Sequence, residues 1–123
     1  MASVLEVDEL TMYILVRADL KMGTGKVAGQ CCHAVQSLIL SPTLLPELLA
    51  EYTGVLHPKI ILKIPDEATL DSFVAVCVEH NFPHHVVVDL GRTQIAANTR
   101  TVLGIGPIRK STVPDSIRVL KLY

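Results

Sequence analysis

A lysine and a glutamine lie one helical turn apart in a segment that opens with two glycines. Lys26 follows Gly23 and Gly25. Gln30 and His33 come after Lys26 at the spacing that places side chains on one face of a helix. The dipole at the start of a helix disfavours a lysine, whereas the N–H groups exposed there suit an anion. These residues are therefore a candidate site for an anionic group, although a solvated helix face would show the same pattern.

An aspartate directly follows a run of three valines, Val86 to Val88. Any single aspartate in such a place is commonly explained by a turn that its carboxylate caps. Near a lysine at a helix N-terminus, however, Asp89 could orient or deprotonate water while Lys26 steadies an oxyanion. Further side chains that could support this chemistry follow in the sequence: Arg92, Thr93, Thr99, Arg100 and Thr101.

The hydrophobic pattern predicts the elements that position these residues. Apolar runs predict four strands, the last ended by a proline, at residues 12–16, 59–64, 86–88 and 101–106. Helical spacing and helix-breaking residues predict helices at residues 25–40, 43–52, 65–80 and 112–119. The order β-α-α-β-α-β-β-α predicts an α/β fold with a mixed four-stranded sheet flanked by helices. We expect residues 11–123 to form a single compact domain, after a short lead-in of residues 1–10.

The predicted order of elements also places the candidate residues. In open α/β sheets, ligands gather at the carboxyl ends of strands and at the adjoining helix N-termini. The first strand and its helix bring Asp19, Lys26 and Gln30 to that edge, and the third strand brings Asp89. His33 shares the face of Lys26 and is expected to support the site without lying at its centre.

Two further expectations concern the helices. Thr43 is expected to cap the second helix through its hydroxyl group. In the third helix, an apolar stripe is expected to face the core: Leu70, Phe73, Val74, Cys77 and Val78.

Composition limits both the fold and the class of function. The 123 residues are 50% hydrophobic and 4% aromatic, which suits one domain with an aliphatic core. The formal net charge of -1 argues against a protein that coats nucleic acid by bulk charge, but not against a local basic patch. No apolar run approaches the roughly 18 residues of a membrane span, and the acidic N-terminal stretch is no secretory signal. These features predict a cytoplasmic protein without a membrane segment.

The three cysteines, two of them adjacent, lack the spacing of a zinc site and indicate reduced thiols. Neither a cysteine placed for activation nor a Gly-x-Ser-x-Gly elbow is present. We therefore expect no bound metal, and water as the attacking group.

Three separated motifs are similar to those of a known family. The segments Arg17–Ala34, Asp89–Ile95 and Thr101–Pro107 resemble, in that order, motifs of the type 2 peptidyl-tRNA hydrolases of archaea and eukaryotes, and Leu120–Leu122 is also similar. The resemblance implies hydrolysis of the ester that joins a peptide to the 3′ end of a tRNA, which releases the peptide and recycles the tRNA for translation. It also implies a small α/β fold, no metal or cofactor, a peptidyl-tRNA substrate and, commonly, a homodimer.

The resemblance also implies functional residues. The family's lysine, aspartate and two threonines match Lys26, Asp89, Thr93 and Thr101, and its glutamine matches Gln30. We expect Asp89 to hold or activate water and Lys26 to stabilise the oxyanion, unless Lys26 instead binds a phosphate. Gln30 and the threonines would orient the ester and the terminal ribose. Further substrate-binding candidates are Asp19, His33, Arg92 and Arg100. A local basic surface for tRNA is expected from Arg92, Arg100, Arg109 and Lys110.

Two other classes of function fit the same residues. One is a catalytically inactive hydrolase-fold domain that binds a protein partner, and the other is an esterase or amidase for smaller substrates. The first has no need of Lys26 and Asp89, so their presence argues against it. Preference for a tRNA-linked peptide over a free peptidyl ester separates the second from the hydrolase.

Overall fold

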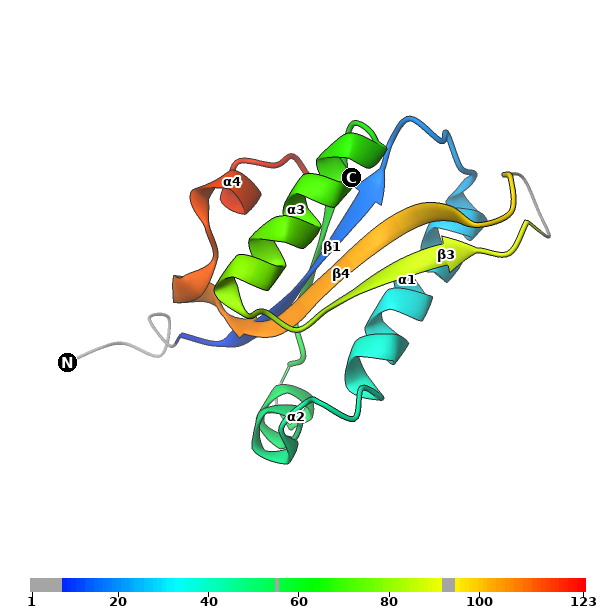
Figure 1. Cartoon of the computed structure of the whole chain (residues 1–123). Helices are drawn as coiled ribbons and strands as arrows, with labels where there is room; N and C mark the ends of the chain where they lie inside the picture. The colour runs from blue at the N-terminus through cyan, green and yellow to red at the C-terminus, as the bar shows by residue number, and fades with distance from the viewer. Residues whose placement is uncertain (1–7, 55, 92–94) are drawn as a thin grey trace.

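A four-stranded sheet runs through the centre of the molecule (Figure 1). The structure is a computed structural model, and it describes residues 8–54, 56–91 and 95–123. Its strands are β1 (Leu10–Arg17), β2 (Lys59–Ile64), β3 (His84–Asp89) and β4 (Thr99–Arg109). The helices are α1 (Thr24–Ile39), α2 (Pro46–Thr53), α3 (Glu67–His80) and α4 (Asp115–Arg118). This element order confirms the predicted α/β arrangement.

The sheet is mixed, as predicted, with the strand order β2-β1-β4-β3. β1 pairs in parallel with β2, whereas β4 runs antiparallel to both β1 and β3. The carboxyl ends of β1, β2 and β3 therefore lie at one edge of the sheet, together with the start of β4. This edge is where the candidate residues were expected to gather.

Two apolar cores lie on the two faces of the sheet. All eight residues of β1 are buried, which confirms a strand covered on both faces. Met12 and Ile14 belong to the core beneath α1 and α2, while Tyr13 and Leu15 belong to the core beneath α3 and α4. Figure 1 shows α1 on one side of the sheet and α3 with α4 on the other.

The last strand is longer than predicted, because Pro107 does not end it. Tyr13 pairs with Ile105 and Thr11 with Ile108, so the register shifts and Pro107 lies in an irregular stretch of β4. A proline in such a bulge removes no hydrogen bond from the ladder. Pairing then resumes and continues to the end of β4.

The predicted cap of the second helix is wrong, whereas the predicted apolar stripe of the third helix is correct except at Val78. Leu45 precedes α2 and Pro46 opens it, because the fixed φ of proline suits the first helical position. The hydroxyl of Thr43 instead hydrogen-bonds to that of Ser41 at 2.9 Å. In α3, Val78 is 67% exposed, since the buried face is set by other positions at spacings of three and four: Leu70, Phe73 and Cys77.

The last helix is also shorter than predicted. Residues 110–112 form a separate 3-10 turn, and Pro114 is extended at the N-cap position of α4. The chain after α4 returns to the edge of β2, where the N–H of Lys63 donates to the carbonyl of Lys121 at 2.9 Å.

Candidate active site

Lys26 and Asp89 meet at the predicted edge of the sheet. Nζ of Lys26 lies 2.8 Å from Oδ1 of Asp89, and the two side chains are only 13% and 7% exposed. Lys26 lies in the first turn of α1, and Asp89 is the last residue of β3. Because water is largely excluded from both groups, their attraction is stronger than that of a surface ion pair.

The first turn of α1 contains no side chain that offsets the positive charge of Lys26. Gly23 is the N-cap of α1 and makes no side-chain cap, and the first turn contains no acidic residue. The positive end of α1 is therefore not neutralised by the helix's own side chains. Asp89 supplies the compensating negative charge from β3.

The second carboxylate oxygen of Asp89 is buried and accepts no hydrogen bond from the residues that the structure describes. Buried carboxylate oxygens in proteins nearly always accept one. The geometry thus gives Asp89 one oxygen that holds Lys26 and one that can accept a proton from a water molecule or a substrate.

Gln30 and Thr101 form a second buried pair beside the first. Nε2 of Gln30 donates to Oγ1 of Thr101 at 2.8 Å, and that hydroxyl donates to the carbonyl of Val87 at 3.3 Å. Gln30 lies one turn after Lys26 on α1, and Val87 lies two residues before Asp89 on β3. The pair therefore ties α1, β3 and β4 together next to the lysine and the carboxylate.

A β-bulge lies where Thr101 enters the site, and sequence reasoning missed it. Val87 of β3 pairs with Val102 of β4, but the next residue, Val88, pairs with Arg100. Thr101 is therefore an extra residue of β4 with no partner on β3. Bulges of this kind turn a side chain away from the face that strict alternation would give it.

The bulge decides which face of the sheet each of two neighbours reaches. Leu103 belongs to the core beneath α3, so strict alternation would put Thr101 on that face as well. Thr101 instead contacts Gln30 of α1, and Arg100 is the residue that points to α3, where it pairs with Asp71. Without the extra residue, the threonine would lie on the wrong face of the sheet.

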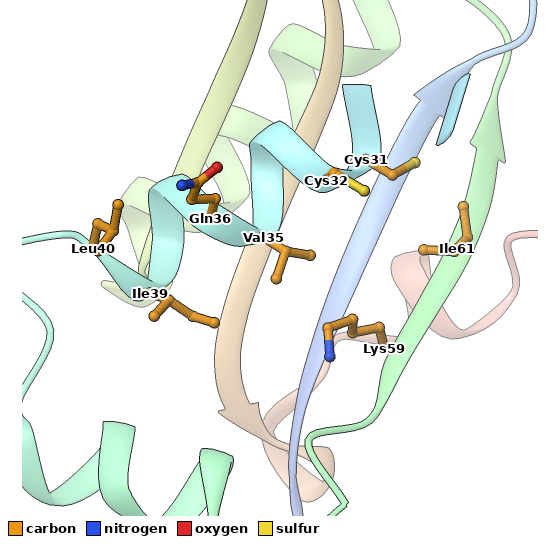
Figure 2. Close-up of a pocket in the computed structure, with 8 residues that line it drawn as sticks. All are labelled: Cys31, Cys32, Val35, Gln36, Ile39, Leu40, Lys59 and Ile61. Carbon is orange, nitrogen blue, oxygen red and sulfur yellow. The ribbon is translucent and has the colours of Figure 1, made fainter. Parts of the chain in front are cut away.

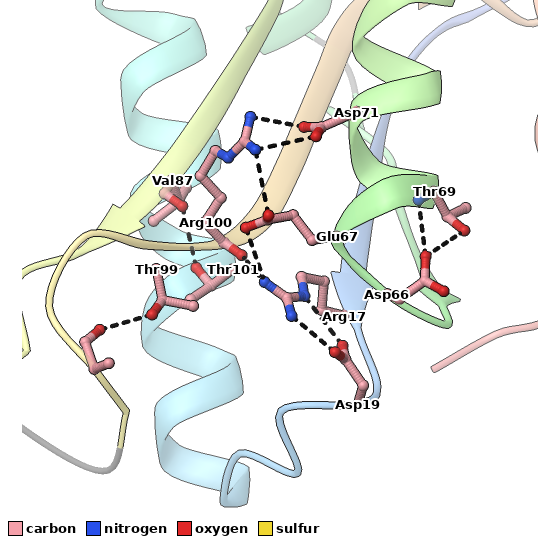
Figure 3. A network of polar contacts seen from close by, with 11 residues as sticks. Arg17, Asp19, Asp66, Glu67, Thr69, Asp71, Val87, Thr99, Arg100 and Thr101 are labelled. Carbon is pink, nitrogen blue, oxygen red and sulfur yellow. Dashed lines mark hydrogen bonds and ion pairs between the residues drawn. The ribbon is translucent and has the colours of Figure 1, made fainter.

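Asp19, which was predicted to join Lys26, is held by a nearer arginine. Nε and Nη2 of Arg17 donate to the two carboxylate oxygens of Asp19 at 3.0 and 2.7 Å (Figure 3). These hydrogen bonds keep the pKa of Asp19 below its ordinary value. Because Arg17 lies two residues away and binds this carboxylate through two hydrogen bonds, Asp19 pairs with Arg17 and not with Lys26.

The other substrate-binding candidates are not brought to Lys26. The guanidinium of Arg100 lies 2.6 and 3.0 Å from the two carboxylate oxygens of Asp71, over the α3 face (Figure 3). His33 is exposed, and it makes no hydrogen bond or ion pair with any residue in the described ranges. Arg92 and Thr93 lie outside the described residues.

A separate apolar hollow of about 430 Å³ lies between α1 and β2 (Figure 2). Cys31 and Cys32 line it, and no candidate residue does. Burial raises the pKa of the Cys31 thiol to about 11 and that of Cys77 to about 12. Both thiols are therefore protonated at neutral pH and poor nucleophiles.

The described part of the chain contains no cluster of three His, Cys, Asp or Glu side chains placed to hold a metal ion. Among the same residues, no helix is both long and apolar enough to cross a membrane.

Fold and site together define a small α/β protein with a buried lysine–aspartate centre at the carboxyl edge of a mixed sheet. The family model described as Peptidyl-tRNA hydrolase PTH2 matches residues 10–123, and the chain belongs to this family. The resemblance noted in the sequence is thus confirmed.

Relatives from cattle, yeast and an archaeon carry the same kind of name. Peptidyl-tRNA hydrolase 2, mitochondrial, from Bos taurus is 44% identical over 99% of this chain and 69% of its own length. Peptidyl-tRNA hydrolase 2 from Saccharomyces cerevisiae is 38% identical over 94% of this chain and 59% of its own. Peptidyl-tRNA hydrolase from Sulfurisphaera tokodaii is 39% identical over 90% of this chain and 96% of its own. The chain therefore matches nearly the whole of the archaeal relative and about two thirds of the cattle protein.

Proposed function

We propose that this protein hydrolyses the ester bond of peptidyl-tRNA, giving a free peptide and a free tRNA. The observation that carries the proposal is the buried contact of 2.8 Å between Lys26 and Asp89, in a chain of the PTH2 family. The relatives' names favour a hydrolase over an inactive interaction domain or an esterase for smaller substrates.

The first step is attack by water on the ester carbonyl carbon. The oxygen of Asp89 that accepts no hydrogen bond from the described residues takes a proton from the water as the water oxygen bonds to that carbon. The carbonyl oxygen becomes an oxyanion, which the ammonium of Lys26 and the N–H groups at the start of α1 stabilise. The carbon–oxygen bond to the terminal ribose then breaks, and protonated Asp89 returns the proton to the ribose oxygen.

Gln30 and Thr101 have an orienting role in this scheme. The Thr101 hydroxyl donates to Val87 and accepts from Gln30, so it holds the glutamine amide in one orientation. The remaining N–H and the carbonyl of that amide can then bind the ester or the terminal ribose. We assign Thr93 the same task, following its match to the family's second threonine.

The remaining substrate-binding proposals concern charged groups for tRNA. Asp19, His33, Arg92 and Arg100 keep this role as predictions. For Arg100 to bind a phosphate, its guanidinium must leave Asp71, which costs the energy of that ion pair. His33, which is exposed, has no such pair to break.

The test is peptide release from N-acetylaminoacyl-tRNA, compared with unblocked aminoacyl-tRNA and a small peptidyl methyl ester. Turnover of the blocked tRNA alone is the expected result. Equal turnover of the small ester would favour the general esterase. No turnover of any substrate by the folded protein would favour the inactive interaction domain.

A cytoplasmic location and a homodimer remain proposals. The free thiols of Cys31, Cys32 and Cys77 suit a reducing compartment, whereas the cattle relative is named mitochondrial. Cell fractionation decides between these locations, and analytical ultracentrifugation at several protein concentrations tests the dimer.

A further inference from the structure

We propose that Arg17 is a positioning residue for this hydrolysis, acting on the β-bulge that presents Thr101. This inference rests on the proposed function and deepens it. Arg17 does not reach the reacting atoms. It fixes the backbone of β4 immediately before the bulge, and Asp19 in turn fixes Arg17.

All three nitrogens of the Arg17 guanidinium donate hydrogen bonds, and the side chain is only 9% exposed. Nη1 donates to the carbonyl oxygen of Arg100 at 2.9 Å. Nε and Nη2 donate to both oxygens of Asp19, and Nη1 also lies 3.6 Å from a carboxylate oxygen of Glu67 (Figure 3). A planar guanidinium held by such a fork has little freedom to move.

The contact with Arg100 continues the sheet where main-chain pairing stops. β1 pairs with β4 at Leu15 with Leu103 and at Val16 with Val102, and the pairing ends there. At the next step, the side chain of Arg17 takes the place of a main-chain donor and binds the Arg100 carbonyl. The Arg100 carbonyl thus keeps a hydrogen-bond donor on the β1 side, immediately before the unpaired residue of the bulge.

The anchored carbonyl is joined directly to the residue that enters the site. The carbonyl carbon of Arg100 is bonded to the nitrogen of Thr101, and the Thr101 hydroxyl accepts from Gln30 at 2.8 Å. Gln30 lies one turn from Lys26 on the same helix. A shift of Thr101 by about 1 Å would misplace the glutamine amide, and errors of that size cost roughly 100-fold in rate.

The competing explanation is that Arg17 only stabilises the fold. The chain offers a matched control, since Arg109 at the other end of β4 also pairs through two nitrogens with a carboxylate, that of Glu51. Arg109 donates to no carbonyl next to the site. Arg109→Met therefore removes a similar ion pair without touching the bulge.

The experiment measures kcat and KM for N-acetylaminoacyl-tRNA, and urea unfolding, in Arg17→Met, Arg17→Lys and Arg109→Met. We expect Arg17→Met to lower kcat about 10-fold to 100-fold with KM nearly unchanged. Arg17→Lys should restore part of kcat, because a lysine can still donate to the Arg100 carbonyl. Arg109→Met should leave kcat unchanged, because Arg109 does not reach the bulge and a role in binding tRNA would change KM.

A double-mutant cycle with Thr101→Val isolates the proposed route. If Arg17 acts through Thr101, the double variant should be no slower than the slower single variant. Multiplying effects, a raised KM with normal kcat, or an equal loss in Arg109→Met would overturn the inference. If Arg17→Met does not fold, the same cycle is read with Arg17→Lys.

The two proposals fail in different ways. If the folded wild-type protein releases no peptide from the blocked tRNA, the proposed function is wrong and the positioning role falls with it. If the wild type is active but Arg17 and Thr101 act independently, only the positioning role is wrong.

Discussion

The amide of Gln30 donates to the hydroxyl of Thr101 at 2.8 Å, and both side chains are buried between α1 and β4. The sequence predicted both residues as parts of the site, but gave no reason for them to bind each other. Their contact makes the position of the glutamine amide depend on the conformation of β4.

Thr101→Val should therefore destabilise the protein and slow hydrolysis. Valine has nearly the same shape but leaves the buried amide of Gln30 without its acceptor, which costs about 1–3 kcal/mol of unfolding free energy. Urea unfolding checks the stability and single-turnover hydrolysis checks the rate. Thr53→Val is the control, since the exposed Thr53 hydroxyl only bonds to Leu49 within α2. An equal loss of stability in the control would contradict the account.

Lys26→Ala should lower kcat about 100-fold to 1,000-fold, the usual effect of removing one oxyanion donor. Lys110→Ala is a matched control for kcat, because Lys110 also lies near a carboxylate, with Nζ 3.0 Å from Glu9, but follows the far end of β4, where a role in binding tRNA would change only KM. Circular dichroism of both variants should remain that of the folded protein. Normal turnover in Lys26→Ala would remove the lysine from the mechanism.

The cysteines should take no part in the reaction. Because the pKa of Cys31 is raised to about 11 by burial, its thiolate is scarce at pH 7.5 and becomes plentiful only as the pH approaches 11. Mass spectrometry after iodoacetamide treatment should show Cys32, which is exposed, alkylated before Cys31 and Cys77. Cys31→Ser should hydrolyse peptidyl-tRNA at the wild-type rate, and a lost rate would indicate a cysteine nucleophile.

The ion pair of Asp19 should stabilise the fold in a pH-dependent way. Arg17 lowers the pKa of Asp19 in the folded state, so its contribution is complete above the unfolded pKa, near 3.8, and is lost as the pH falls through the lower folded value. Asp19→Asn should therefore lower the melting temperature at pH 7, and the difference from wild type should shrink below pH 3.8. In an Arg17→Met background the same substitution should have no such effect. A difference that grows on acidification would have the wrong sign.

The sequence was sufficient to bring Lys26 and Asp89 to the same edge. Both positions follow from local patterns, the start of a helix and the end of an apolar strand, and the order of elements puts these ends together. The element order and the antiparallel third and fourth strands were predictable for the same reason.

The bulge at Thr101 was not predictable, because it depends on the register between β3 and β4. No local pattern marks a single extra residue in one strand, although that residue decides which face Thr101 occupies. The partner of Asp19 was missed for a related reason. No local pattern shows that Arg17, at the end of an apolar strand, is buried and is the nearest strong donor to Asp19.

The measurement that tests the central claim most directly is single-turnover release of labelled peptide from N-acetylaminoacyl-tRNA by Asp89→Asn. Glu51→Gln serves as its matched control, since Glu51 is a carboxylate paired with Arg109 away from the site. If Asp89 accepts the proton of the attacking water, the rate should fall about 100-fold to 10,000-fold in Asp89→Asn and stay at the wild-type level in Glu51→Gln. A wild-type rate in folded Asp89→Asn would contradict the proposed mechanism.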